Sequence, residues 1–335
     1  MSGRRTRLSA LRLTALAFGV ALSPTAAPAQ DSLPPPRPTI GLVLSGGGAR
    51  GLAHIGVIEV LEELRVPVDV ITGTSMGAIV GGLYASGLPA DSIRVLVSRV
   101  DWEGILADTP PRSSLDFAHR ARQRRYTVEI DVGVSGAGLD LPGGFISGHE
   151  LGLLLRRATL PVALVDDFTR LPIPFAAVAT DIVTFERVVL DDGDLVEAMR
   201  ASMAIPVAIA PVYLDGRLLV DGGLVDDLPV ELAREMGADI VIAVNVTPPL
   251  LDRDELTDLL GVAQQVARGL GLQGVDRKLA SADVGIVPEL EEIGVFDFRR
   301  ADEIVSLGTG AARARSDSLA AWSLPSDAYE AHRST

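Results

Sequence analysis

Residues Gly73-Thr74-Ser75-Met76-Gly77 constrain the fold most, because they form a G-x-S-x-G motif between two different hydrophobic patterns. Residues 66–72 before it are apolar and β-branched, which predicts a buried strand. Residues 78–85 after it are apolar with several small side chains, which predicts a closely packed helix. A sharp turn between such a strand and helix lifts a serine hydroxyl above the sheet, beside backbone N–H groups. Ser75 is therefore a candidate nucleophile.

Strand-like and helix-like segments alternate through much of the chain. Strands are expected over residues 39–45, 68–74, 175–179, 187–190, 218–220 and 239–246, and helices over residues 52–64, 75–86, 149–158, 195–202 and 230–236. Apolar strands that alternate with helices favour a parallel sheet covered on both faces. The predicted fold class is therefore α/β, with three α/β/α layers and a mostly parallel central sheet.

Two regions depart from this pattern. Residues 125–144 alternate and contain glycine turns, which suggests a small β excursion. After Val246 the pattern is mainly helical, over residues 254–270 and 300–319, with a strand-like segment at 284–288 between them. We therefore expect residues 39–247 to form the main domain and residues 248–335 to close it as a mainly helical segment.

The first 29 residues have the features of an export signal. An arginine-rich start leads into a short apolar run, and Ala27-Pro28-Ala29 is an A-x-A cleavage site that places the cut before Gln30. The apolar run is too short to span a bilayer as a mature helix, and an uncleaved anchor is the alternative. Residues 30–38 form a proline-rich lead-in. The expected location is the periplasm or cell envelope, or outside the cell.

Composition excludes several kinds of chemistry. The formal net charge of −14 argues against nucleic-acid binding and against simple electrostatic adhesion to anionic lipid. The chain has no cysteine, which excludes disulfides, thiol catalysis and a cysteine metal site. No histidine spacing typical of a metal site is present, so we expect neither a metal nor another cofactor.

A second glycine-rich loop, Gly46-Gly47-Gly48-Ala49-Arg50-Gly51, follows the first predicted strand and opens a helix. Its N–H groups suit either a dinucleotide pyrophosphate or an oxyanion hole for Ser75, with Arg50 adding charge or supporting the loop. In a dinucleotide site, an acidic residue at the end of the second strand binds the ribose. Asp69 instead lies in or before that strand, whose end leads to Ser75. The oxyanion hole is therefore favoured, with a simple tight turn as the plainest alternative.

The four histidines are weak candidates for the base that Ser75 needs. His332 lies in the polar tail, His119 in an arginine-rich stretch and His149 at a helix start. His54 shares a helix face with apolar residues, which predicts a half-buried histidine with satisfied hydrogen bonds. None lies in a strand-end loop after Ser75, where a serine–aspartate–histidine order would place it. A serine–histidine hydrolase using His54 is kept as the mechanistic alternative.

Asp221 is the better candidate for the base. A short strand over residues 218–220 ends in Asp221-Gly222-Gly223, and the two glycines allow a sharp turn just after the acid. An aspartate with an ordinary pKa of ~3.9 is a poor base in water, so it must act through a close hydrogen bond in a partly dry site. An ordinary Asp-Gly turn is the alternative interpretation.

Two neighbouring segments have less specific patterns. Asp226 and Asp227 precede Pro229, which is typical of a helix start. Residues 204–214 carry no charge and include two prolines, which suits either a buried strand and loop or an apolar wall where acyl chains enter.

Taken together, the motifs resemble those of the patatin-like phospholipase family. Gly46-Gly47-Gly48-Ala49-Arg50-Gly51 matches its oxyanion loop, Gly73-Thr74-Ser75-Met76-Gly77 its nucleophile elbow, and Asp221-Gly222-Gly223 its acid motif. The similarity covers about residues 38–246 and is weaker beyond. Within the family, the chain looks most like the exported bacterial type, here as a patatin domain without the C-terminal membrane barrel. Asp227 stands where those relatives usually have asparagine.

The resemblance implies a function that the residues alone do not specify. It implies hydrolysis of lipid acyl esters, of the phospholipase A or lysophospholipase type, by a Ser75–Asp221 dyad through an acyl-serine, without metal. The expected partner is a phospholipid or another acyl-ester lipid, with peripheral membrane contact and no nucleic acid. A non-catalytic lipid-binding or envelope-assembly module on the same fold is the alternative function.

Overall fold

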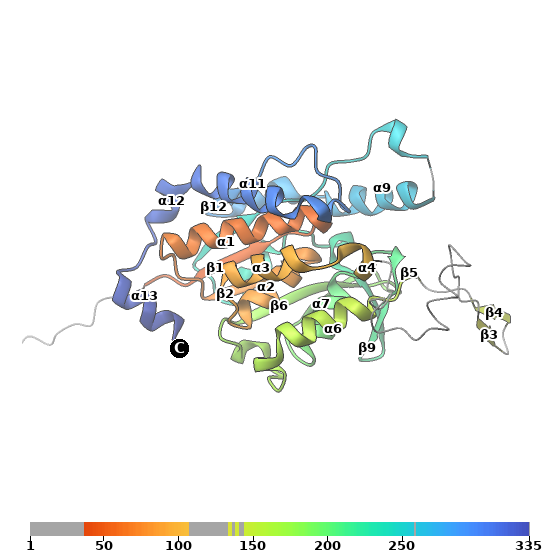
Figure 1. The fold of residues 1–335 in the computed structure, drawn as a ribbon, viewed down its shortest axis with the longest axis horizontal. Coiled ribbons are helices and arrows are strands. Elements are labelled where there is room, and N and C mark those ends of the chain that lie inside the picture. Colours follow the sequence, from red (N-terminus) through yellow and green to blue (C-terminus); the bar gives the residue numbers. More distant parts are fainter. Residues whose placement is uncertain (1–36, 107–132, 136–137, 141–143, 258, 335) are drawn as a thin grey trace, which may run out of the picture. The chain divides into compact units, whose positions relative to one another are not determined.

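The alternating strands assemble into one central sheet in the computed structural model of the chain (Figure 1). The structure describes residues 37–106, 133–135, 138–140, 144–257 and 259–334. Within these residues the sheet has eight strands in the order β12-β11-β1-β2-β6-β10-β9, with β7 paired to β6. The strands are β1 (Ile40–Leu44), β2 (Val70–Thr74), β6 (Phe175–Asp181), β7 (Glu186–Leu190), β9 (Val212–Leu214), β10 (Arg217–Asp221), β11 (Ile240–Val244) and β12 (Val284–Ile286).

Helices cover both faces of this sheet, as three-layer packing requires. The described helices are α1 (Ala53–Glu63), α2 (Met76–Ala85), α3 (Ala90–Arg99), α4 (Trp102–Leu106), α6 (His149–Ala158), α7 (Leu195–Ser202), α8 (Val230–Glu235), α9 (Leu259–Gly271), α10 (Val275–Ser281), α11 (Ala301–Arg313), α12 (Ser316–Ala320) and α13 (Ser326–Arg333). Helices α1 and α11 lie side by side (Figure 1). Among the described helices, none is both long and apolar enough to cross a membrane.

Successive side chains along a strand point to opposite faces of the sheet, and this alternation divides the core in two. Leu42 and Leu44 of β1 pack into the larger core with α1, α2 and α11, whereas Val43 faces α8 and α10 in a smaller one. All three side chains are fully buried. Each such burial contributes about 1.5–3 kcal/mol, which explains why the strands read as continuous apolar runs.

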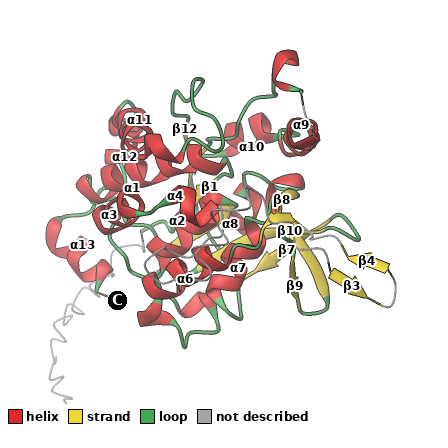
Figure 2. Ribbon diagram, turned by 45° about the vertical axis from the view of Figure 1, so that its right-hand side comes forward, coloured by secondary structure: helices red, strands yellow, loops and turns green. Residues whose placement is uncertain are grey.

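The α/β class and the mostly parallel sheet are confirmed, with an antiparallel edge. Strands β12, β11, β1, β2 and β6 pair in parallel, whereas β7, β9 and β10 pair in antiparallel fashion at one end of the sheet (Figure 2). Short turns that reverse the chain join two of the three antiparallel pairs, at 182–185 between β6 and β7 and at Asp215-Gly216 between β9 and β10. Strand β10 pairs with β6 across a long connection.

Several predicted segments differ in detail or lie outside the description. The export signal and residues 30–36 of the lead-in lie outside the described residues, as do residues 125–132 of the expected β excursion. Its later part includes β3 (Gly133–Ser135) paired with β4 (Gly138–Asp140). The uncharged segment 204–214 forms β9 and a short strand β8 (Val207–Ile209), which pairs with β5 (Gly144–Ile146).

Candidate active site

Ser75 occupies the sharp turn between β2 and α2. Its backbone has φ 54° and ψ −122°, in the left-handed half of conformational space that a residue with a side chain rarely adopts. Close packing on both sides holds it there, because a Cβ on Gly77 would collide with the carbonyl of Leu44, and one on Gly73 with that of Gly77. The glycines of the motif therefore let α2 begin directly against β1 and β2, which fixes the turn.

The sheet brings Asp221 to this turn from the opposite direction. Thr74, the last residue of β2, pairs in parallel with Val178 of β6, and Asp221, the last residue of β10, pairs in antiparallel fashion with Ala179. Since β7 pairs along the other edge of β6, β2 and β10 share one edge and meet there end to end. Ser75 directly follows Thr74, so this register places it beside Asp221.

Ser75 and Asp221 are hydrogen-bonded. The Ser75 hydroxyl donates to Asp221 Oδ2 at 2.6 Å, and the backbone N–H of Gly223 donates to Asp221 Oδ1 at 2.8 Å. The Thr180 hydroxyl holds the main chain by donating to the Asp221 carbonyl at 2.9 Å. Burial raises the pKa of Asp221 to about 6, and the hydrogen bonds from Ser75 and Gly223 limit that rise. At neutral pH the carboxylate is therefore ionised but more basic than an exposed aspartate.

Ser202, at the end of α7, holds the backbone of the Ser75 turn. Its hydroxyl accepts the backbone N–H of Ser75 at 2.9 Å and donates to the Val178 carbonyl at 2.6 Å. The hydroxyl thus links the Ser75 backbone to β6, the strand that also positions Asp221. Ser202 is not predicted from the sequence, because a small polar residue at a helix end has no distinctive pattern.

The glycine loop approaches Ser75 from β1. Gly47 and Gly48 line the same pocket as Ser75, and no partner for their N–H groups is found among the described residues. Gly46 differs, because its N–H donates to the Asp227 carbonyl at 3.2 Å. Gly46 is therefore not an available oxyanion donor, which corrects its inclusion in the expected oxyanion hole. Gly46 instead lets the loop backbone lie close to Ser75, since a Cβ on Gly46 would lie 3.2 Å from the Ser75 Cβ.

Arg50 supports this loop through main-chain carbonyls. Its Nε donates to Val246 at 2.9 Å, and its Nη1 donates to Leu290 at 2.5 Å and Ile293 at 3.1 Å. The buried guanidinium ties the loop to the segment that carries Val295, whose carbonyl accepts the N–H of Ala49 at 2.9 Å. Of the two roles expected for Arg50, these contacts correspond to loop support rather than charge placed in the pocket.

His54 is fully buried rather than half-buried. Its Nε2 lies 2.9 Å from the Ser45 carbonyl, which requires the proton on Nε2. Desolvation lowers its pKa to about 4, so the ring is neutral. His54 therefore anchors the start of the glycine loop through Ser45, while the hydroxyl of Ser75 is bonded to Asp221.

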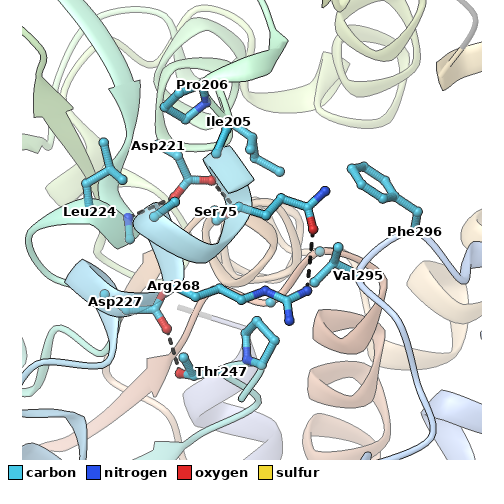
Figure 3. A pocket seen from close by; sticks show the side chains of 18 residues that line it. Ser75, Ile205, Pro206, Asp221, Leu224, Asp227, Thr247, Arg268, Val295 and Phe296 are labelled. Carbon is cyan, nitrogen blue, oxygen red and sulfur yellow. Dashed lines mark hydrogen bonds between the residues drawn. The ribbon is translucent and has the colours of Figure 1, made fainter. Parts of the chain in front are cut away.

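A pocket opens over the serine and the aspartate (Figure 3). Its walls are mainly apolar: Ile205 and Pro206 from the uncharged segment, Leu224 after the acid motif, and Val295 and Phe296 from the opposite loop. Helix α9 adds Ala263, Gln264, Ala267, Arg268 and Gly271 to the lining. The proposed wall from residues 204–214 is thus present at its first residues, while its later residues form β8 and β9.

The model of the family described as patatin-like phospholipase matches residues 42–234, which is more than half of the chain. The chain belongs to the patatin-like phospholipase family. The matched range contains the glycine loop, the serine turn and the Asp221 motif of this patatin-like domain. Helix α9 and the 290–296 loop, which complete the pocket, lie beyond it.

Relatives of this patatin-like chain include longer proteins. It is 38% identical over 212 residues to an uncharacterized NTE family protein of Mycobacterium tuberculosis, covering 62% of this chain and 49% of the relative. It is 28% identical over 295 residues to Lysophospholipase NTE1 of Pyricularia oryzae, covering 81% and 18%. The chain thus spans half or less of the length of these relatives. Among solved structures, VipD from Legionella pneumophila has a TM-score of 0.44 and 16% identity, covering 85% of this chain and 67% of VipD.

Asp227, assigned from the sequence to a helix start, lines the pocket of this patatin-like domain together with Asp221. Burial, together with the charges of Asp221 and Asp226, raises its pKa to about 7. The sequence gives one indication that Asp227 lies at the site, since it closely follows the Asp221-Gly222-Gly223 motif. Arg268 and Gln264 are not predicted from the sequence, because the pattern of α9 indicates only a helix that closes the domain.

Proposed function

We propose that this protein is a lipid acyl hydrolase in which Ser75 is the nucleophile and Asp221 its base. The observation that carries the proposal is the 2.6 Å hydrogen bond from the Ser75 hydroxyl to a buried Asp221 carboxylate at the floor of an apolar pocket. Membership of the patatin-like phospholipase family and a relative named as a lysophospholipase support a lipid substrate.

The geometry suits acyl transfer in two steps. As Ser75 Oγ attacks the ester carbonyl carbon, its proton passes to Asp221 Oδ2, and the N–H groups of Gly47 and Gly48 stabilise the negative oxygen. The leaving alcohol takes the proton from Asp221 as the tetrahedral intermediate collapses to an acyl-serine. Water then loses a proton to Asp221, attacks the acyl-serine and releases the fatty acid, and Ser75 regains its hydrogen.

Peripheral membrane contact is the second part of the proposal. Val262 and Val266 stand one turn apart on α9 with 49% and 60% of their surface exposed, next to pocket-lining Ala263 and Ala267. Exposed apolar side chains beside a lipid pocket suit insertion at a bilayer surface. A Val262→Ser, Val266→Ser double variant is expected to lose activity on vesicles while it retains activity on a water-soluble ester.

The function is tested by fatty-acid release from lysophospholipid, from phospholipid vesicles and from a short-chain ester. Ser75→Ala and Asp221→Asn should each abolish release while thermal unfolding shows a folded protein. Asp181→Asn is a matched control, because Asp181 is buried at the end of β6 but lies outside the pocket lining. His54→Gln distinguishes the serine–aspartate mechanism from the serine–histidine alternative. The alternative requires that this variant loses all turnover while it stays folded.

A non-catalytic lipid-binding module predicts a different result. In that case the wild type releases no fatty acid from any ester, and vesicle binding is the same in wild type and Ser75→Ala. Export is a separate proposal that depends on residues 1–29 alone. N-terminal sequencing of protein from the periplasmic and extracellular fractions tests it, with Gln30 as the expected first residue.

A further inference from the structure

Asp227 and Thr247 form a short contact at the wall of the pocket (Figure 3). Asp227 Oδ2 lies 2.5 Å from the Thr247 hydroxyl oxygen, and that oxygen lies 2.6 Å from Asn245 Oδ1. Each oxygen pair at such a distance needs a hydrogen between its members. The threonine hydroxyl has one hydrogen and can therefore satisfy only one of the two contacts.

The identity of the Asn245 atom decides where that hydrogen goes. The backbone N–H of Thr247 donates to the same Asn245 Oδ1 at 3.1 Å, so this atom is the amide oxygen and accepts. The Thr247 hydroxyl donates to it in turn. The hydrogen between Asp227 and Thr247 must then come from the carboxyl group of Asp227.

Asp227 also lies very close to the serine and its partner. A Cβ built on Gly223 would be 2.8 Å from Asp227 Oδ1 and 3.0 Å from Asp221 Oδ1, so an oxygen of each carboxyl group borders the space that one methyl group would fill. A Cβ built on Gly46 would contact both Asp227 Oδ1 and the Ser75 Cβ. A charge on Asp227 would therefore lie beside both Asp221 and the developing oxyanion.

We propose that Asp227 is held as a neutral carboxylic acid that donates its proton to Thr247, and that loss of this proton stops the reaction at Ser75. The second part rests on the proposed hydrolase function. With Asp227 neutral, the site holds one carboxylate, Asp221, which can accept the Ser75 proton. With both ionised, two negative charges repel each other and the oxyanion in a buried site. Asp227 thus acts through Asp221 and the oxyanion loop rather than on the substrate.

The charged groups around Asp227 are compatible with this assignment. They are Asp221 on β10 and Asp226 on its own loop, with Arg268 of α9 in the same pocket lining. Arg50 lies on the glycine loop, whose Gly46 N–H donates to the Asp227 carbonyl. Asp226 is paired with Lys278 at 2.5 Å and Arg187 at 3.3 Å, and Arg50 is bonded to three carbonyls. Burial and the two neighbouring carboxylates raise the pKa of Asp227 to about 7, which agrees with a proton retained to neutral pH.

The test is the pH dependence of kcat/KM on a short-chain ester for wild type, Asp227→Asn and Thr247→Val. Wild type should lose activity as pH rises through about 7, because the reactive form needs the proton on Asp227. Asparagine keeps a donor toward Thr247 and has no proton to lose. The alkaline loss, about tenfold one unit above the pKa, should therefore disappear in Asp227→Asn. An unchanged alkaline limb in this variant overturns the proposal, and Asp181→Asn should match wild type.

Thr247→Val tests whether Asp227 or Thr247 is the donor in the hydrogen bond between them. If Asp227 donates, valine removes an acceptor that stabilises the neutral acid, and the alkaline limb moves to lower pH. If Thr247 donates to a carboxylate, the same change moves the limb to higher pH, which contradicts the proposal. A merely structural role would change the level of activity without either shift.

A readout without substrate separates this proposal from the hydrolase itself. In protein labelled with ¹³C at aspartate carboxyl carbons, the resonance missing from Asp227→Asn should titrate near pH 7. A resonance that titrates below about pH 5 overturns the proton assignment. If wild type releases no fatty acid at any pH, the proposed hydrolase fails, and this titration still decides where the proton lies.

Discussion

Thr74 and Asp221 pair with adjacent residues of β6, Val178 and Ala179, although they end strands that run in opposite directions. Two strands therefore share one edge of β6, and their last residues meet. Ser75 is the next residue after Thr74, so the serine and the aspartate are positioned by sheet register rather than by a long loop. The backbone of β6 sets their separation, so groups that fix the backbone to β6 should also affect the reaction.

Ser202→Ala is the most direct test of this view. It removes the hydroxyl that connects the Ser75 N–H to the Val178 carbonyl, at 2.9 and 2.6 Å. Two buried backbone groups then lack a partner, which should lower the free energy of unfolding by about 1–3 kcal/mol. A displaced Ser75 should also lower kcat by about tenfold or more. Chemical denaturation and ester hydrolysis measure the two effects.

Ser86→Ala is the matched control for Ser202→Ala. Ser86 is also buried, and its hydroxyl donates to the Leu83 carbonyl at 2.7 Å, at the far end of α2 from Ser75. This variant should lose some stability but keep its kcat. Equal kcat in Ser202→Ala and Ser86→Ala would show that the bridge to β6 has no part in positioning the serine.

Gly77→Ala should destabilise the chain strongly, because the new Cβ would collide with the main-chain carbonyl of Leu44. Main-chain atoms of β1 cannot move aside, so the cost should be about 3 kcal/mol, with loss of activity. Gly310→Ala is the opposite case: Gly310 is inside α11, and a Cβ there has nothing within 4 Å. It should gain up to about 1 kcal/mol from helix propensity. Thermal unfolding of Gly77→Ala and Gly310→Ala compares the cost of a steric collision with the gain in helix propensity.

The sequence predicts the parts of the site that depend on local backbone geometry. The turn at Ser75, the loop at Gly47 and the turn after Asp221 each need glycines next to a strand end, and that requirement is visible in the sequence. The bounds of α6 and α7 match the expected helices because their apolar spacing is regular. Positions of these elements in the sheet follow from the alternation of strands and helices.

Long-range hydrogen bonds could not be predicted in this way. Ser202 reaches Ser75 across 127 positions, and Arg50 reaches Leu290 across 240, and neither has a local sequence signature. Asp227 shows the same limit, because an acid before a proline at a helix start is common. Its partner Thr247 follows a different strand, β11, and the contact exists only once that strand lies next to β1.

The stability of the protein should depend on Asp221 in the mildly acidic range. Burial raises its pKa from 3.8 to about 6, so the folded state keeps a proton that the unfolded chain has already lost. The stabilisation is complete below about pH 4 and is lost as pH rises through 6. Asp221→Asn removes it, so the unfolding free energy of the variant relative to wild type should rise by about 3 kcal/mol between pH 4 and 7. Urea denaturation at both pH values measures this, and a relative fall would show that the folded state favours the charged carboxylate.

Arg268 should decide how the pocket distinguishes a phospholipid from a neutral ester. It lies on α9 in the pocket wall, where Nη1 donates to the Pro249 carbonyl at 2.9 Å. A guanidinium in this mainly apolar wall suits the phosphate of a head group, and charge-assisted bonds of this kind contribute about 1.5–3 kcal/mol. Arg268→Met should therefore lower kcat/KM on lysophospholipid by about tenfold or more, with a much smaller loss on a short-chain ester.

Arg277→Met is the control for this change, since Arg277 is exposed on neighbouring α10 and lies outside the pocket lining. It removes the same charge from the protein without altering the pocket wall, so both substrates should keep their wild-type rates. If Arg268→Met instead lowers both rates equally, Arg268 acts by holding the 249 loop against α9, and the preference for a head group must come from elsewhere in the pocket.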